Sequence, residues 1–217
     1  MIQEMIQIIE ENNDFIVILK PHGLSVHNES PSVMEQLQGL KKPIHFVNRL
    51  DQETSGLMII AQRPDLHQKL VSALEGGQKF YRALLRSPWK EKPSQTIWNW
   101  PLTDKAEGRK NPQGISAERK ASETRIEVIR SNQYFTEIRA ELITGRQHQI
   151  RKHSLLAGHP IVGDRRYNEE KYNLNIEKFY GNKRMLLHAE RLHFAFNGMN
   201  FKFENLFDLD RFFDLPK

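Results

Sequence analysis

Residues 48–61 have the sequence NRLDQETSGLMIIA, in which a polar, turn-forming run is followed at once by an apolar run. The apolar half, residues 57–61, is typical of a buried β-strand. The polar half carries Asp51, Thr54 and Ser55, residue types that most often bond the backbone of a turn. Polar side chains set against a core strand are also typical of a functional site. The stretch predicts a turn and a strand. Asp51 could either bond the backbone of the turn or belong to a functional site.

Similar patterns lie on both sides of this stretch. Residues 15–19, FIVIL, predict another buried strand, and Pro21 and Gly23 predict the turn that ends it. The dipeptide Asn197-Gly198 between two apolar segments predicts a tight hairpin, because both residues adopt the positive φ angles that such a turn needs. Further strands are predicted at residues 80–86, 123–130, 133–142, 193–196 and 199–203.

Two helices are predicted. In the first, Asp65 followed by Gln68 resembles a capping box, apolar residues recur at helical spacing, and Gly76-Gly77 ends the run. The second covers residues 148–157 and ends at Gly158. Strands outnumber helices and no regular βαβ alternation is present, so we predict an α+β fold with a largely antiparallel sheet, as a single domain over residues 1–217.

The composition excludes several classes of protein. The chain has 217 residues, of which 38% are hydrophobic, enough for a core. Its apolar runs are far shorter than the ~20 residues that span a bilayer. No secretory signal is visible near the N-terminus, so we expect a cytoplasmic protein. Because the chain has no cysteine, it has neither a disulfide, a thiolate metal site nor a cysteine nucleophile.

The positive charge is concentrated in one region. The formal net charge is +5, and residues 105–151 hold ten Lys or Arg against six Asp or Glu. Within this region, residues 109–114 combine cations with turn formers and predict an exposed loop. Such a region is a candidate docking face for an anionic partner, and a solvated surface is an equal alternative.

A histidine cluster raises the question of a metal site. Five histidines fall within 46 residues, but none forms the His-Glu-x-x-His pattern that places two ligands and a base on one helix face. We therefore predict no metal, and keep a metal-dependent hydrolase as an alternative. The five are His148, His153, His159, His188 and His193.

Residues 48–57 resemble the H-R-L-D-x-x-T-S-G-L signature of the RluA-type pseudouridine synthases, with Asn48 where histidine is usual. Other segments are similar to the remaining motifs of this family, in the same order. They are residues 15–24, ending in KPHGL; 79–83, KFYRA; 145–151, GRQHQIR; 158–167, with GHPI, GD and Tyr167; and 184–189, RMLLHA.

The resemblance implies the pseudouridine synthase catalytic fold and an enzyme that isomerises uridine to pseudouridine in RNA without a cofactor. It implies that Asp51 starts the reaction, that Tyr81 lies against the target base and that Arg151 pairs with Asp51. Leu186 or Leu187 would pack around uracil, and Arg49 would fill the gap left by the extruded nucleotide. The other residues placed at the substrate by the motifs are Thr54, Ser55, Gly56, Arg146, His148 and Gln149.

The expected partner is structured ribosomal or transfer RNA, bound by a monomer without an obligate protein partner. Candidate phosphate contacts are Lys20, Lys79, Arg109, Lys110, Arg146 and Lys152. About 13 residues precede the first core strand, so the chain resembles the family's short form without an S4 RNA-binding domain. A non-catalytic RNA-binding relative is the other alternative; such a relative would have lost Asp51, Tyr81 or Arg151.

Overall fold

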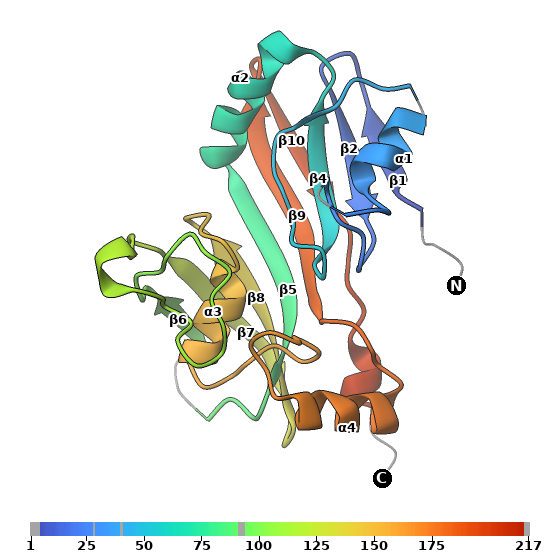
Figure 1. Ribbon diagram of the computed structural model, residues 1–217. Coiled ribbons are helices and arrows are strands. Elements are labelled where there is room, and N and C mark those ends of the chain that lie inside the picture. The colour runs from blue at the N-terminus through green and yellow to red at the C-terminus, as the bar shows by residue number, and fades with distance from the viewer. Residues whose placement is uncertain (1–4, 28, 40, 91–93, 215–217) are drawn as a thin grey trace. The chain divides into compact units, whose positions relative to one another are not determined.

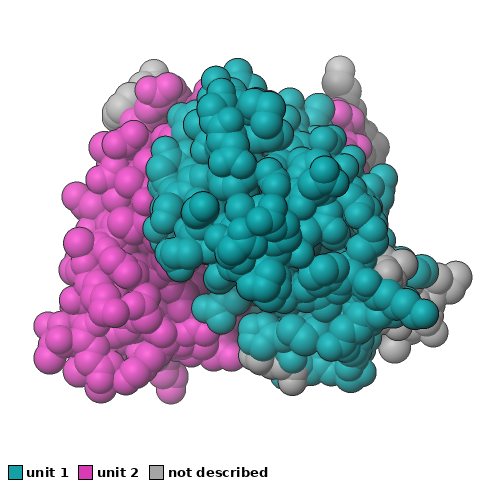
Figure 2. All heavy atoms as spheres, turned by 90° about the horizontal axis from the view of Figure 1, so that it is seen from above, with its two compact units in different colours: residues 1–79, 188–206 teal, residues 80–187, 207–217 magenta. Residues whose placement is uncertain are grey.

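The computed structural model describes residues 5–27, 29–39, 41–90 and 94–214. The chain divides into two compact units, which are coloured separately in Figure 2. Unit 1 comprises residues 1–79 and 188–206, and unit 2 comprises residues 80–187 and 207–217. The extent of one catalytic domain over the whole chain stays a prediction.

Unit 1 contains a mostly antiparallel sheet. Strand β2 (Phe15–Lys20) lies between β1 (Gln7–Glu11) and β4 (Ser55–Ala61), and pairs with both in antiparallel fashion. The short β3 (His45–Phe46) also pairs with β4. Strand β4 pairs in parallel with β9 (Leu187–Phe196), which forms a hairpin with β10 (Met199–Glu204) (Figure 1).

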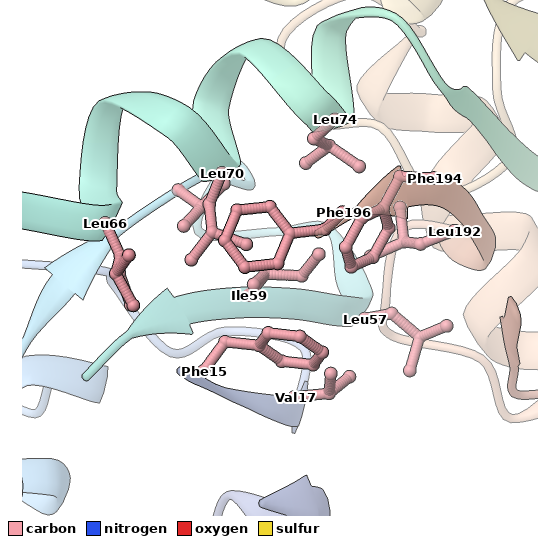
Figure 3. Packing of buried hydrophobic residues seen from close by; sticks show 12 residues of the cluster. Phe15, Val17, Leu57, Ile59, Leu66, Leu70, Leu74, Leu192, Phe194 and Phe196 are labelled. Atoms are coloured by element: carbon pink, nitrogen blue, oxygen red, sulfur yellow. The ribbon is translucent and has the colours of Figure 1, made fainter. Parts of the chain in front are cut away.

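The core of unit 1 lies between this sheet and helix α2 (Pro64–Glu75). Leu66, Leu70 and Leu74 point from α2 toward the strands, where they meet Ile59 and Phe196 among others (Figure 3). Every residue of β4 is buried. A strand covered on both faces needs apolar residues at successive positions, which explains the continuous run in the sequence. Helix α1 (Val33–Gly39) buries its own two apolar anchors, Val33 and Leu37.

The start of α2 differs from the prediction. The helix begins at Pro64, its N-cap is Arg63, and no side chain caps it. Asp65 lies inside the first turn and accepts a hydrogen bond from Arg63 Nη2 at 2.7 Å. The predicted capping box is therefore wrong, because proline, whose φ angle suits the first helical position, sets the boundary two residues earlier.

Unit 2 contains a four-stranded antiparallel sheet in the order β5 (Gln78–Arg86), β8 (Phe135–Leu142), β7 (Thr124–Ser131) and β6 (Gln95–Trp98). It also holds helices α3 (Gln149–Leu156) and α4 (Glu170–Tyr180) and two short 3₁₀ turns, η1 (Ser116–Glu118) and η2 (Asp210–Phe212). One apolar cluster of this unit joins β5, β8, α4 and η2: Leu84, Phe135, Val162, Ile176, Leu186, Leu209 and Phe212.

The α+β class with a largely antiparallel sheet is confirmed. The hairpin is confirmed as well, since Asn197 and Gly198 have φ angles of 49° and 77°. The structure adds α1, α4, β1, β3 and β6, which the sequence analysis did not predict. Among the described residues, no helix has both the length and the apolar character needed to cross a membrane.

Candidate functional site

Asp51 lies in a tight turn of unit 1 just before β4. The Thr54 N–H donates to the Asp51 carbonyl at 3.0 Å, which closes the turn, and the Asp51 side chain is half-buried. Arg49, two residues earlier, is exposed, as a residue that enters RNA must be. The turn therefore presents a carboxylate and a cation from one short segment.

A buried lysine holds this turn. Lys20, at the end of β2, is fully buried, and its Nζ donates to the carbonyls of Pro21, Leu24 and Gln52 at 2.9, 2.7 and 3.1 Å. The Gln52 carbonyl also accepts from the Gly23 N–H at 2.8 Å. Since Gln52 follows Asp51 directly, these bonds fix the backbone that carries the Asp51 side chain. The prediction that Lys20 contacts phosphate is wrong, because its ammonium is enclosed by backbone oxygens.

Asn48 holds the other end of the same turn. Its Oδ1 accepts from the Ile59 N–H at 2.8 Å, and its Nδ2 donates to the Leu57 carbonyl at 3.5 Å. The amide thus pairs with two backbone groups of β4. The residue that departs from the family signature has a structural contact here, and it anchors the segment leading to Asp51.

The three signature residues after the turn are buried at or near the start of β4. Ser55 Oγ lies 2.8 Å from His188 Nδ1, and His188 Nε2 lies 3.0 Å from Asn205 Oδ1. Gly56 has a φ angle of +125°, and a Cβ there would stand 2.4 Å from the Ala189 carbonyl oxygen. Thr54 is 3% exposed. We predicted substrate contacts for these three residues. The structure instead assigns Ser55 and Gly56 to the pairing of β4 with β9, and the substrate contact of Thr54 stays a prediction.

Arg151 is fixed within unit 2 by a buried carboxylate. Its Nε and Nη2 donate to the two oxygens of Asp164 at 2.7 and 2.9 Å, and both residues are almost fully buried. Asp164 Oδ1 also accepts the backbone N–H groups of Arg166 and Tyr167. A two-pronged pair of this kind sets the plane of the guanidinium. The predicted pairing of Arg151 with Asp51 joins two different units and stays a prediction.

Sequence reasoning missed the role of Asp164. It was noted as part of a family motif, and spacing along the chain does not reveal that it lies beside Arg151. The sequence signal that could have indicated a structural carboxylate is Gly163-Asp164 followed by Tyr167. In the structure, Asp164 Oδ1 accepts the Tyr167 N–H at 3.0 Å. The Tyr167 hydroxyl lies 3.0 Å from His148 Nδ1.

His148 and Gln149, at the start of α3, were both predicted to contact substrate, and the structure treats them differently. His148 adopts φ 55°, an uncommon angle for a residue with a side chain, and it remains a candidate for substrate contact. Gln149 is buried, and its amide donates to the Glu123 carbonyl and Thr124 Oγ1 and accepts from Thr144 Oγ1 and the Arg146 N–H. All four bonds of an amide are thus used within the protein, so Gln149 is structural and the predicted substrate contact is wrong.

Tyr81 and the two leucines lie in different packing environments. Tyr81 is on β5 and 8% exposed, while the adjacent Arg82 pairs with Glu137 at 2.9 Å. Alternate residues of a strand face opposite sides, so Tyr81 lies on the face away from that ion pair. Leu186 belongs to the apolar cluster of unit 2, and its contact with uracil stays a prediction. Leu187 is buried as well, and its contact with uracil stays a prediction.

Two further lysines donate hydrogen bonds to backbone carbonyls. Lys152 is fully buried, and its Nζ donates to the carbonyls of Thr103 and Lys105 at 2.9 and 2.7 Å, so the predicted phosphate contact is wrong. Lys79 donates to the Leu74 carbonyl at the end of α2. Burial lowers the pKa of the Lys79 ammonium, and Glu75 partly opposes this effect. Lys79 is a weak candidate for phosphate binding.

The remaining candidate cations reach the surface. Arg109 and Lys110 are exposed in the predicted loop. Arg146 is half-buried and donates through Nε to the Ala121 carbonyl at 3.2 Å. These three stay candidates for phosphate contact.

His153 belongs to a buried hydrogen-bond network. Its Nε2 lies 2.9 Å from the Trp100 carbonyl and its Nδ1 lies 2.9 Å from Thr124 Oγ1. The carbonyl can only accept, so Nε2 carries the proton. Burial is the main cause that lowers the pKa of His153 to about 4, and Lys152 adds to it against the opposing Trp100 bond. Within the described ranges, no three His, Asp or Glu side chains are grouped to hold a metal ion.

Known proteins are similar to this chain over most of its length. The chain is 35% identical over 202 residues to ribosomal large subunit pseudouridine synthase C of Salmonella typhi, and 34% identical to the protein of that name from Escherichia coli strain K12. Each match covers 88% of this chain and 62% of the relative. The chain thus spans less than two thirds of the length of these relatives.

Solved structures share the fold. The human protein RNA pseudouridylate synthase domain containing 4 superimposes with a TM-score of 0.75 at 22% identity, over 94% of this chain and 90% of the other. The related human domain containing 1 gives 0.74 at 22% identity, over 93% and 83%. The family model described as RNA pseudouridylate synthase matches residues 14–155, which include Asp51, Tyr81 and Arg151. The chain therefore belongs to the RNA pseudouridylate synthase family.

Proposed function

We propose that this protein is an RNA pseudouridine synthase. The reaction breaks the bond between ribose C1′ and uracil N1, rotates the base and joins C1′ to C5. It conserves atoms and oxidation state, so it requires no co-reactant. The observation that carries the proposal is the Asp51 turn, which Asn48 and Lys20 hold from both ends within the segment that matches the family.

Three side chains take the chemical roles. Asp51 starts the reaction as a nucleophile or a base, since a half-buried carboxylate on a fixed turn reaches substrate without rearrangement. Tyr81 lies against the base and handles the C5 proton. Arg151, whose plane Asp164 sets, pairs with the Asp51 carboxylate when the site is assembled.

Ribosomal RNA is the first substrate class to test, because the curated relatives are named for the ribosomal large subunit. Transfer RNA is the second class. The uridine is selected by the shape and loop sequence of the RNA, and Arg49 fills the space left by the extruded nucleotide. We further propose that the enzyme acts in the cytoplasm, where such RNA is found, and that it binds RNA as a monomer.

The test is a map of pseudouridine in total RNA from cells with and without the gene, repeated with the purified full chain on RNA from the deletion strain. We expect one or a few uridines to depend on the gene and to be restored by the wild-type protein in the presence of EDTA and monovalent salt. RNA binding without any restored pseudouridine would instead show a non-catalytic RNA-binding protein. A chain that makes no pseudouridine but hydrolyses a substrate, with an activity that EDTA removes and zinc restores, would support the hydrolase alternative.

A further inference from the structure

A groove of about 530 Å³ opens on unit 2 between two polar segments. One wall is formed by residues 107–111 and the other by residues 165–170. We call it the basic groove and define it by its charged residues: Arg109, Lys110, Arg165, Arg166, Glu107 and Glu170. Only the first two were considered in the sequence analysis.

The charge of the basic groove is positive. Four cations face two carboxylates, and all four cations are exposed. In the part of the chain that the structure describes, the side chains of Arg109, Lys110 and Arg165 make no hydrogen bond or ion pair within the protein. Glu107 is half-buried, and its Oε1 accepts from Thr103 Oγ1 at 3.1 Å. The groove therefore offers three uncommitted cations to a ligand.

The first wall is fixed although it has few apolar residues. Lys152, buried in α3, donates to the Thr103 and Lys105 carbonyls. Arg119 donates through Nε and Nη2 to the Gly114 carbonyl at 3.1 and 2.7 Å. Arg166 Nη1 donates across the groove to the Ala106 carbonyl at 2.9 Å. A loop held at these points loses little entropy when its cations bind a ligand.

The second wall is built on the carboxylate that holds Arg151. Asp164 Oδ1 accepts the Arg166 N–H at 2.9 Å and the Tyr167 N–H at 3.0 Å, so it shapes the turn that carries Arg165 and Arg166. The same oxygen accepts from Arg151 Nη2. The basic groove thus has a fixed position relative to Arg151 inside unit 2.

We propose that the basic groove binds the phosphodiester backbone of the RNA next to the nucleotide that reacts. Exposed cations on two facing walls suit a chain of spaced negative charges, whereas a single phosphate ion calls for convergent donors in an enclosed pocket. The proposal rests on the proposed function for the identity of the RNA. It assigns to Arg165 and Arg166 a contact that the family signature does not contain.

The experiment measures RNA affinity without turnover. The full chain carrying Asp51→Asn is titrated with a stem-loop RNA of 20 nucleotides at several KCl concentrations. A variant that adds Arg109→Ala, Lys110→Ala and Arg165→Ala is compared with a control that adds Lys69→Ala, Lys178→Ala and Lys202→Ala. The control removes the same charge from exposed lysines that do not line the groove.

We expect the groove variant to bind at least tenfold more weakly than the control in 0.1 M KCl. Its plot of log affinity against log salt should be shallower by about 2, at ~0.7 per lost contact with single-stranded phosphate. Equal affinities and equal slopes for the two triple variants would overturn the proposal. Melting temperatures near that of the parent show that both variants fold.

A substitution of opposite sign provides a second test. Glu170 lines the same groove, so Glu170→Gln removes a negative charge and should tighten binding of the same RNA. Weaker or unchanged binding by this variant would contradict the proposal. The two hypotheses fail separately: a wild-type chain that makes no pseudouridine refutes the proposed function, while a groove variant that binds like its control refutes the groove.

Discussion

Two buried lysines each hold a polar loop in place by hydrogen bonds to its carbonyls, and the two loops present different functional groups. In unit 1, Lys20 donates to three carbonyls and fixes the turn that contains Asp51. In unit 2, Lys152 donates to two carbonyls and fixes the loop that continues to Arg109 and Lys110. One loop presents the group expected to react, and the other presents groups expected to bind.

The comparison suggests that Lys20 positions a group for the chemical step, whereas Lys152 positions groups for RNA binding. A buried ammonium is stabilised only where oxygens surround it, so each lysine requires its loop to stay in place. Loss of the first anchor should reduce the rate of the chemical step. Loss of the second should weaken RNA binding and leave the chemical step nearly intact.

The largest effect is expected from the reacting group itself. Asp51→Asn keeps the shape of the side chain and removes its charge, so product formation should fall by roughly 10³-fold or more. Single-turnover assays on the mapped substrate measure this loss. RNA affinity and melting temperature should stay near their wild-type values. Turnover at the wild-type rate would remove Asp51 from the mechanism.

The next largest effect is expected from the anchor of unit 1. Lys20→Met leaves buried carbonyls without their donor, which should lower the free energy of unfolding by about 3 kcal/mol. Displacement of the turn should lower kcat by about tenfold or more while KM changes little. Urea unfolding and steady-state kinetics measure the two effects. Lys69→Met, on the exposed face of α2, is the control and should change neither.

The anchor of unit 2 should give the reverse kinetic pattern. Lys152→Met releases the loop at Thr103 and Lys105, so RNA affinity should fall and the salt slope should become shallower by about 1. At saturating RNA, kcat should fall less than in Lys20→Met. A Lys152→Met protein that loses kcat and keeps its affinity would show that the two anchors have the same role.

The smallest effect comes from pH and concerns the same loop. His153 bonds the Trp100 carbonyl, and its pKa is about 4 in the folded protein against 6.5 for the free side chain. The unfolded chain therefore binds more protons between these values, so stability is lost as the pH falls through this window. At pH 5 the loss should be about 2 kcal/mol relative to pH 7.5.

Urea unfolding at these two pH values measures the loss, with His153→Gln as the matched variant. Glutamine can donate to the Trp100 carbonyl and does not titrate, so the variant should lack this part of the pH dependence. The carboxylates common to both proteins cancel in the comparison. Identical pH dependence in the two proteins would show that His153 is not the group that titrates.

The elements that the sequence predicts correctly are those with a local cause. The apolar runs at residues 15–19 and 57–61 and the Asn197-Gly198 turn each specify their conformation within a few residues. Helix α4 was missed although Tyr172, Ile176 and Tyr180 recur at helical spacing and pack in one apolar cluster, because no side-chain cap marks its start.

The candidate site shows the same limit. Asp51, Tyr81 and Arg151 were found through family motifs, which are contiguous in the sequence. Lys20 and Lys152 were assigned to phosphate because lysine is nearly always exposed. Their burial depends on Gln52, 32 residues away, and on Thr103, 49 residues away. No pattern in a single sequence predicts such convergence of distant carbonyls.

The contact between Trp100 and His153 gives the protein a built-in optical reporter. The two rings lie 6.0 Å apart in an edge arrangement, and the indole is 36% exposed. Indole emission shifts to longer wavelength in water and is quenched by a neighbouring imidazolium. Departure of this loop from α3 should therefore appear as a red shift, and protonation of His153 as a loss of intensity, with Trp100→Phe supplying the background from the other two tryptophans.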